Sequence, residues 1–273
     1  MNRRRIPSTG EQLPVIGCGT YVGFDRQPGS SEYARLPQVL QALRSAGGSV
    51  LDTSPMYGRA ETTLGELLWK QQPTATTFLA TKVWTQGEQA GLRQMETSMT
   101  RLAVPRVDLM QVHNLVDWRV HLKTLRAWRD AGRIRYLGIT HYTSSAYADV
   151  EAVLSSERLD FLQINHSIDE PTAAHRLLPL AEQRGVAVLV NRPFGGGSLL
   201  QRLRHRPLPA WAGDLGCTSW AQVLLKFALS HCAVTCVIPG SGRPEHMQAN
   251  AEAGCGAIPG PDFWRDKADQ ILL

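Results

Sequence analysis

Strand-like apolar segments alternate with helical segments along the whole chain, at a step of about thirty residues, the length of one βα unit. The eight strands are predicted to end near Thr20, Asp52, Lys82, His113, Thr140, Gln163, Asn191 and Pro239. Between them, apolar residues recur at helical spacing, as at Leu92, Met95 and Met99. Regular alternation makes the strands parallel, and eight repeats predict an α/β fold of the (β/α)8 TIM-barrel type rather than an open sheet.

Two features extend this pattern. Before the first strand, Arg5-Ile6 and Gln12-Leu13 flank the turn at Ser8–Gly10, which predicts an N-terminal β-hairpin that caps one end of the barrel. The last βα step is the longest and locates an insertion of about twenty residues between Gly195 and Gly216, longer than ordinary loops. No linker or change in composition divides the chain, so residues 1–273 are predicted to form a single domain.

Composition excludes several classes of protein. The hydrophobic content of 43% and charged content of 19% are typical of a globular protein, and no apolar run approaches the roughly 20 residues of a membrane span. The five cysteines lack zinc or CxxC spacing and predict free thiols in a reducing compartment, and no apolar segment follows Arg3–Arg5, so we expect a cytoplasmic protein. The net charge of +5 permits an anionic partner. The sequence has no basic stripe with interleaved aromatic residues, however, so we expect neither a nucleic-acid nor a membrane partner.

Four polar side chains fall at or just beyond consecutive strand ends. Asp52 ends the second strand, Tyr57 lies on the following loop, Lys82 ends the third strand and His113 ends the fourth. Buried carboxylates are rare unless they are paired, so Asp52 needs a cation, which Lys82 can provide. Active sites of such barrels lie at the C-terminal ends of the strands, where we expect these four side chains to meet.

This set of residues favours a proton-donating phenol. The pKa of a free tyrosine is near 10, too high for efficient acid–base catalysis at neutral pH. The ammonium of Lys82 is expected to lower the pKa of Tyr57, and Asp52 would fix the position of that ammonium. His113 could then hydrogen-bond a substrate oxygen. Each residue alone also fits an ordinary structural role, as an ion pair, a loop tyrosine or a buried histidine.

Glycine-rich loops follow the seventh and eighth strands, where barrels of this type commonly bind phosphate. They span residues 191–198 and 239–245, and the second opens a helix at Pro244, whose free N–H groups would face an anion. The insertion carries Arg202, Arg204 and Arg206, which we expect to fold over the same anion. A dinucleotide held there by its phosphates would supply a hydride.

Asp52–Gly58, Ala80–Trp84 and Leu109–His113 resemble the motifs of the aldo/keto reductases, and the resemblance covers essentially the whole chain. It implies an oxidoreductase that transfers a hydride from NADP(H) to a small aldehyde or ketone. It also implies that Tyr57 is the general acid, that Lys82 and Asp52 tune it, and that His113 orients the carbonyl.

The resemblance assigns a cofactor site by motif position. Thr140 and His141 fall where the family holds the nicotinamide carboxamide, together with Gln163, whereas Ser241 and Asn250 fall in the segment that holds the adenosine phosphate and adenine. The full set of expected cofactor contacts is Gly19, Thr20, Thr140, His141, Gln163, Asn191, Arg192, Pro193, Gly195, Ile238, Gly240, Ser241, Arg243, His246 and Asn250.

The sequence departs from the family pattern at several cofactor positions. Asn191 and Arg192 stand where the family usually stacks an aromatic residue on the nicotinamide, so we expect a less rigid hold on that ring. His141 replaces the usual asparagine, although its N–H can still bond an amide. Arg243 and His246 are the cationic or potentially cationic groups near the adenosine phosphate segment, which favours NADP over NAD.

The substrate pocket is defined only by its walls. Tyr21 and Trp84 fall at positions that line the family's pocket and are expected, with His113, to bind substrate. The tail after Asp262 is short, which leaves little C-terminal wall and predicts an open pocket. Neither the physiological substrate nor the oligomeric state follows from the sequence.

Three other functions compete with carbonyl reduction. A metal-dependent hydrolase could use His113, His141 and His166, but the first strand offers no ligand and no metal is expected. A Schiff-base lyase could use Lys82, but the adjacent Asp52 argues for a protonated lysine. A cofactor-binding sensor with slow turnover would keep the same fold and the same four residues.

Overall fold

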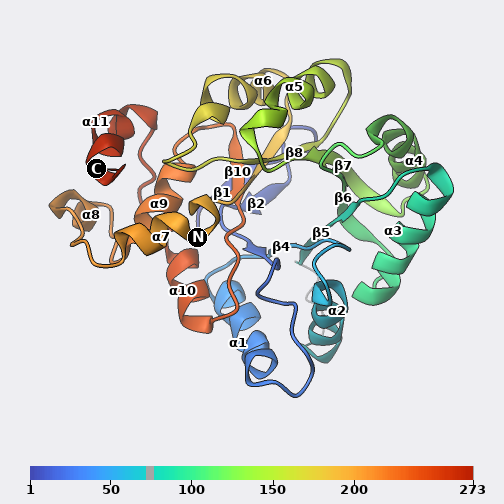
Figure 1. Ribbon diagram of the computed structural model, residues 1–273, viewed down its shortest axis with the longest axis horizontal. Coiled ribbons are helices and arrows are strands. Elements are labelled where there is room, and N and C mark those ends of the chain that lie inside the picture. Colours follow the sequence, from blue (N-terminus) through green and yellow to red (C-terminus); the bar gives the residue numbers. More distant parts are fainter. Residues whose placement is uncertain (72–76, 273) are drawn as a thin grey trace.

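Eight parallel strands form one curled sheet surrounded by helices in the computed structural model, which describes residues 1–71 and 77–272 (Figure 1). The strands are β3 (Cys18–Gly19), β4 (Val50–Asp52), β5 (Phe78–Val83), β6 (Val107–His113), β7 (Ile134–Thr140), β8 (Phe161–Asn165), β9 (Ala187–Asn191) and β10 (Val234–Val237). Each strand pairs with the next one along the chain, so all their C-terminal ends lie at the same edge of the sheet. The predicted strand ends agree with these bounds to within about two residues.

The first and last strands of the sheet also come together. Parallel bridges join Ile16 to Val237 and Gly19 to Gly240, and the Gly19 N–H donates to the Pro239 carbonyl at 3.1 Å. This approach explains the glycine at the end of β3, since a Cβ on Gly19 would lie only 2.9 Å from the carbonyl oxygen of Ile238. Gly19, one of the expected cofactor contacts, therefore lies beside the glycine-rich loop that follows β10.

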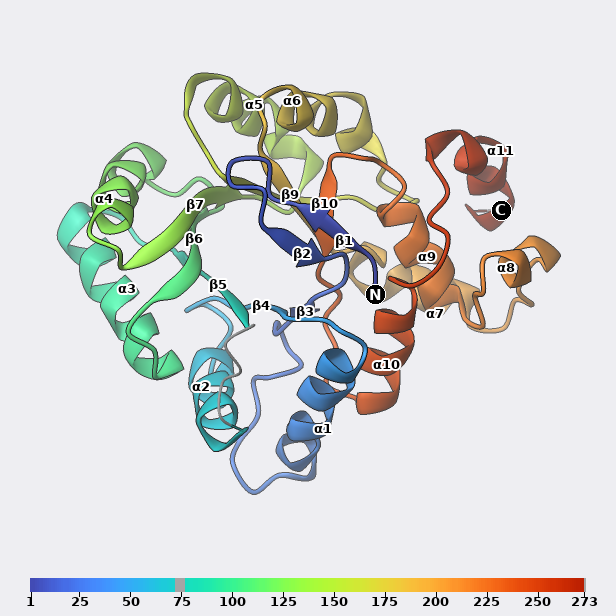
Figure 2. The same ribbon diagram turned by 180° about the vertical axis from the view of Figure 1, so that it is seen from behind.

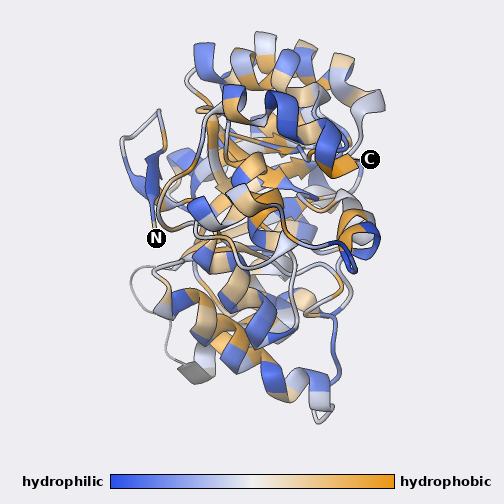
Figure 3. Ribbon diagram, turned by 90° about the vertical axis from the view of Figure 1, so that its left-hand side faces the viewer, coloured by the Kyte–Doolittle hydropathy of each residue, from blue (hydrophilic) through white to orange (hydrophobic). Residues whose placement is uncertain are grey.

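A helix follows each strand, as predicted. These helices are α1 (Ser31–Ser45), α2 (Ala60–Gln71), α3 (Glu88–Leu102), α4 (Trp118–Asp130), α5 (Tyr147–Ser156), α6 (Leu177–Gln183), α9 (Trp220–Ala228) and α10 (Pro244–Glu252), with 3₁₀ turns at Ser144–Ala146 (η1), Thr172–His175 (η2) and Gly195–Gly197 (η3). The local sequence fixes the start of two of these helices. Ser30 caps α1 by accepting the backbone N–H of Tyr33, and Ser219 caps α9 by accepting that of Gln222. Figure 3 shows hydrophilic and hydrophobic bands alternating along the outer helices, because one face of each helix packs inward.

The N-terminal hairpin is present and closes off the end of the sheet opposite the strand C-termini. It consists of β1 (Arg3–Arg5) and β2 (Gln12–Pro14), paired antiparallel, and lies across the end that faces the viewer in Figure 2. Ile6 and Leu13 are 0% and 2% exposed and belong to the apolar cluster inside the sheet, together with Phe78 and Phe161. The hairpin therefore supplies the apolar floor below the site.

Three helices were not predicted individually. The insertion forms α7 (Ser198–Leu203) and α8 (Ala210–Asp214), and the C-terminal tail forms α11 (Pro261–Leu272), which lies beside them in both Figures 1 and 2. Trp264 of α11 is 2% exposed, with its ring 5.8 Å from that of Trp211 and 5.6 Å from that of Phe227. Among the described helices, none is long and apolar enough to cross a membrane.

Candidate active site

Asp52, Tyr57, Lys82 and His113 lie together at the C-terminal ends of β4, β5 and β6. Asp52 and His113 are the last residues of β4 and β6, and Lys82 precedes the last residue of β5. Parallel pairing sets Asp52 beside Ala80 and Lys82 beside Gln111, so alternate residues of adjacent strands point into the same space. The structure thus brings together the four side chains that the sequence singled out.

Asp52 and Lys82 form a buried ion pair. Lys82 Nζ lies 2.7 Å from Asp52 Oδ2, and the two side chains are 1% and 3% exposed. Lys82 also donates to the Thr53 carbonyl at 2.7 Å, and Gln111 Nε2 donates to Asp52 Oδ1 at 3.4 Å. Burial would lower the pKa of Lys82, but the negative charge of Asp52 and its hydrogen bond to the ammonium help to raise it instead, so the ammonium persists at neutral pH.

The loop that carries Tyr57 is fixed from outside the strand. Gly58 has φ of +58°, a conformation that favours glycine, and a Cβ there would lie 2.4 Å from the Asp25 carboxylate. Asp25 Oδ1 in turn accepts the Arg59 N–H at 2.9 Å, just before α2 begins. The turn therefore holds Tyr57 over the ion pair, with Lys82 Nζ 5.0 Å from the centre of its ring.

The pKa of Tyr57 differs from the sequence-based expectation. Burial raises the pKa of the phenol above its ordinary value, and the positive charge of Lys82 offsets that rise only in part. The expected net lowering is therefore wrong for the structure described, because desolvation of a phenolate is the larger effect. The raised pKa keeps Tyr57 protonated at neutral pH, which is the form that can donate a proton.

His113 is buried and neutral. The side chain is 5% exposed, and burial, followed by the positive charge of Lys82, lowers its pKa to about 3. Its Nδ1 lies 3.1 Å from the Ser54 hydroxyl, and its ring meets that of Tyr57 edge-on, with 6.1 Å between ring centres. Sequence reasoning missed Ser54 and Gln111 as partners of these groups, although Ser54 lies within the same 52–58 motif.

Aromatic side chains form the exposed rim of this site. Tyr21 is 62% exposed and its ring centre is 5.0 Å from that of Tyr57, while Trp84 is 42% exposed and 6.4 Å from His113. Both residues predicted to line the substrate pocket therefore contact the central four residues. Met56, at 39% exposure, adds a third apolar side chain from the same loop as Tyr57.

Two buried amide oxygens, one from the middle of β8 and one from the last residue of β9, have no hydrogen-bond partner. Gln163 is 1% exposed and its Oε1 accepts no bond, and the same holds for Asn191 Oδ1, while Asn191 Nδ2 donates to the His141 carbonyl at 3.0 Å. The His141 N–H donates to the Gln163 carbonyl at 3.0 Å, and Thr140 pairs with Gln163 across β7 and β8. A buried unpaired acceptor costs roughly 1–3 kcal/mol, so this arrangement suits a ligand that brings N–H donors.

The glycine-rich loops lie where the sequence placed them, after β9 and β10. Gly195 has φ of +59°, and Ser241 Oγ accepts the Arg243 N–H at 3.2 Å just before α10. Arg243 and His246 are exposed at the start of α10, and Asn250 is 4% exposed within it. Among the other expected cofactor contacts, Thr20, Ile238 and Pro193 are buried, and the Thr20 hydroxyl donates to the Asp52 carbonyl. Gly240 and Arg192 are exposed, and the Arg192 guanidinium lies 5.6 Å from the centre of the Tyr142 ring.

Two of the three arginines of the insertion, Arg202 and Arg206, contact the C-terminal helix. Arg202 donates to the Leu272 carbonyl at 2.8 Å, and Arg206 donates to the carbonyls of Ile271 and Gln270 at 2.7 and 2.8 Å. These carbonyls end α11 and carry the negative end of its dipole, which attracts cations. In this structure both side chains therefore hydrogen-bond to the C-terminal end of α11, and their expected contact with a cofactor phosphate stays a prediction.

Comparison with known proteins identifies the family. A sequence profile described as the aldo/keto reductase family matches residues 15–259 of the chain. The chain belongs to the aldo/keto reductase family. An aldo-keto reductase of Mycobacterium sp. (strain JLS) is 28% identical over 253 residues, which cover 88% of this chain and 83% of that protein.

Solved structures of aldo/keto reductases share the fold. One from Klebsiella pneumoniae in complex with NADPH superposes with a TM-score of 0.81 at 22% identity, covering 99% of this chain and 95% of that one. Another from the same organism, in complex with NADP and acetate, has a TM-score of 0.79 at 21% identity and covers 96% of this chain and 92% of that one. At these identities the likeness establishes the arrangement of strands and helices.

Proposed function

We propose that this aldo/keto reductase catalyses NADP(H)-dependent reduction of a small aldehyde or ketone, with Tyr57 as the general acid. The observation that carries the proposal is the protonated Tyr57 phenol beside the buried Lys82–Asp52 ion pair, next to a neutral His113. A bound NADPH would supply the hydride to the carbonyl carbon. The Tyr57 hydroxyl would give its proton to the carbonyl oxygen, so that the product is an alcohol and Tyr57 is left as a phenolate.

The residues around Tyr57 have separate roles in this proposal. The Lys82 ammonium stabilises the phenolate that forms on proton transfer, and Asp52 holds that ammonium in place. His113, neutral at physiological pH, would accept a hydrogen bond from the Ser54 hydroxyl at Nδ1, 3.1 Å away, and would then donate from Nε2 to the substrate oxygen. Tyr21 and Trp84 form apolar walls against which the substrate packs.

The residues at the ends of β7 to β10 fit NADP(H). The unpaired Oε1 of Gln163 would accept from the nicotinamide carboxamide, with Thr140 and His141 completing that contact. The loops at 191–198 and 239–245 would hold the phosphates, and the exposed Arg243 and His246 would favour a 2′-phosphate. Support comes from the Klebsiella pneumoniae relatives, whose structures are complexes with NADP and NADPH.

We also propose that the curled sheet is a closed (β/α)8 barrel and that residues 1–273 form one domain. The bridges from Ile16 to Val237 and from Gly19 to Gly240 support closure. The partner in this account is a small carbonyl compound, with no nucleic acid or membrane involved, in a cytoplasmic setting. The four central residues all come from one chain.

The competing functions have less support. The raised pKa of Lys82 disfavours the free amine that a Schiff-base lyase needs. Within the described part of the chain, the one group of three potential metal ligands that come together does not include His113, His141 or His166. A slow sensor retains the same site and is separated from a reductase only by its rate.

The test is NADPH consumption by the purified chain over a panel of aliphatic and aromatic aldehydes and ketones. We expect turnover of at least one carbonyl class at about 1 s⁻¹ or faster, the lower end of typical enzyme rates. Tight NADPH binding without turnover of any carbonyl would contradict the reductase and favour the sensor. Failure to bind either NADPH or NADH would contradict both.

A further inference from the structure

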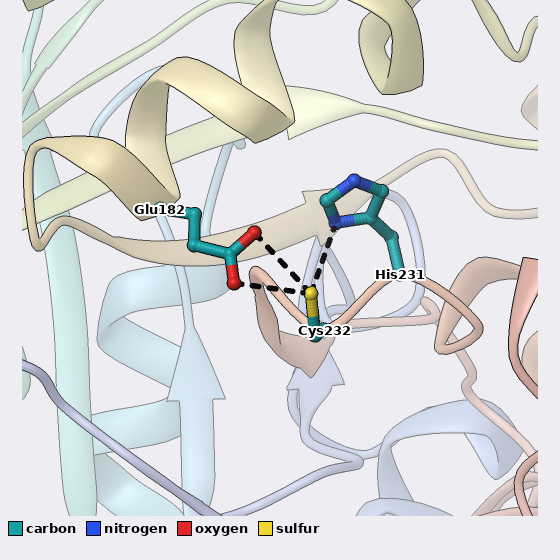
Figure 4. A group of neighbouring side chains, drawn as sticks. All are labelled: Glu182, His231 and Cys232. Carbon is teal, nitrogen blue, oxygen red and sulfur yellow. Dashed lines mark hydrogen bonds between the residues drawn. The ribbon is translucent and has the colours of Figure 1, made fainter.

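A second cluster of reactive side chains lies at the opposite end of the sheet from Tyr57. Glu182 belongs to α6, and His231 and Cys232 belong to the loop between α9 and the start of β10. Because β10 begins at Val234, this cluster lies at the N-terminal edge of the strands, on the side of the hairpin. Figure 4 shows the three side chains converging on one point from two different elements.

The ligand atoms of the cluster are close together. Cys232 Sγ lies 3.2 and 3.3 Å from the two carboxylate oxygens of Glu182 and 4.0 Å from His231 Nδ1. One ligand atom from each residue lies within 4.8 Å of the others. Tetrahedral zinc with bonds of about 2.0–2.3 Å holds its ligand atoms roughly 3.2–3.8 Å apart, so side-chain shifts of about 1 Å or less would suffice.

The backbone that presents His231 and Cys232 is held by Arg4 of the hairpin. The Arg4 guanidinium donates to the carbonyls of His231 at 3.0 Å and Leu229 at 2.8 Å, and also to that of Val234. Three bonds from one planar group fix the loop on both sides of Cys232. The loop is thus already ordered before a ligand binds, so ligand binding does not have to offset the entropy lost in ordering it.

We propose that Glu182, His231 and Cys232 bind a zinc ion, with solvent as the fourth ligand. A thiolate, an imidazole and a carboxylate together are the donors that suit zinc, and the two negative charges of Glu182 and the Cys232 thiolate balance Zn²⁺. His231 Nδ1 accepts the Ala233 N–H at 3.1 Å, a bond that the metal would replace. The ion would clamp α6 to the α9–β10 loop and stabilise the fold without taking part in carbonyl reduction.

Cobalt(II) substitution tests the site directly. Titration of the tag-free, metal-free protein with Co²⁺ should produce one equivalent of a near-ultraviolet thiolate-to-cobalt absorption band, and Zn²⁺ should displace it. Cys232→Ser should abolish the band, and Glu182→Gln should weaken Co²⁺ binding by about tenfold or more. Cys255→Ser is the matched control, because Cys255 is an exposed cysteine outside the cluster, and it should leave the band unchanged.

Thiol protection gives a second readout in the Cys255→Ser background, in which Cys232 is the remaining exposed cysteine of the described residues. Zn²⁺ should slow the reaction of Cys232 with a disulfide reagent by about tenfold or more, and should raise the melting temperature only while Cys232 is present. No cobalt band, or equal thiol reactivity with and without Zn²⁺, would overturn the proposal and leave Cys232 as a thiol that donates to Glu182. Carbonyl reduction by the Cys232→Ser variant should match the wild type, so the zinc site and the proposed function fail independently.

Discussion

Replacing Lys82 with methionine tests the energetic consequence of the buried ion pair. Lys82 Nζ and Asp52 Oδ2 are 2.7 Å apart, and the side chains are 1% and 3% exposed, so water cannot solvate the carboxylate once the ammonium is gone. Leaving one partner of a buried pair unpaired typically costs about 3–5 kcal/mol. Asp52 would keep the 3.4 Å bond from Gln111, a weak compensation, so we expect Lys82→Met to destabilise the protein by about 3–5 kcal/mol.

Urea unfolding followed by circular dichroism at neutral pH measures this cost, and two variants control it. The double variant Asp52→Asn with Lys82→Met removes both charges and should recover most of the lost stability, because replacing a buried pair by neutral groups is often nearly neutral. Lys123→Met changes an exposed lysine of α4 and should stay within about 0.5 kcal/mol of the wild type. A single variant that loses less than about 1 kcal/mol, or a double variant as unstable as the single one, would refute this reasoning.

Three further predictions concern pH, cofactor choice and the insertion. Burial lowers the pKa of His113 from 6.5 to about 3, so the unfolded chain takes up a proton that the folded protein does not, and the free energy of unfolding should fall by up to about 1.4 kcal/mol per pH unit as the pH drops from 6.5 toward 3. Urea unfolding should show a smaller fall for His113→Gln, and an unchanged dependence of stability on pH would contradict this prediction. Arg243→Ala should weaken NADPH binding about tenfold while leaving NADH nearly unchanged in a fluorescence titration, since it removes a charge-assisted bond to a 2′-phosphate; equal loss for both cofactors would contradict that contact. Hydrogen exchange across residues 195–216 should slow when NADPH binds, and exchange that NADPH leaves unaltered would mean that Arg202 and Arg206 stay on α11.

The strand ends could be predicted from the sequence because each strand is a short apolar run closed by a polar residue. Asp52 and His113 therefore fell at the correct ends of β4 and β6, and parallel pairing alone was enough to place them together with Lys82. The glycine at the end of the first strand also has a structural reason, because a side chain on Gly19 would collide with the backbone at the end of the last strand. Regular alternation thus determined both the fold class and the position of the candidate site.

Features that depend on packing could not be predicted. The pKa of Tyr57 is raised because its burial outweighs Lys82, and burial of a loop side chain is a property of the folded chain. Arg206 and the α11 carbonyls that it contacts are about 65 residues apart, so no local pattern predicts that contact, and its expected contact with a cofactor phosphate stays a prediction. Glu182 and Cys232 are likewise 50 residues apart, and no short-range spacing connects them.

The most direct test of the central claim is the rate of carbonyl reduction by Tyr57→Phe. This change keeps the ring that packs beside Tyr21 and removes only the hydroxyl that is proposed to donate the proton. Tyr21→Phe is the matched control, since it removes a hydroxyl from an exposed tyrosine on the same rim, and it should stay within a few-fold of the wild-type rate.

Single-turnover reduction with saturating NADPH should fall by about 10²- to 10⁴-fold in Tyr57→Phe, the usual contribution of general acid catalysis, while NADPH affinity stays within about twofold. A Tyr57→Phe enzyme that reduces carbonyls at close to the wild-type rate would contradict the assignment of Tyr57 as the acid.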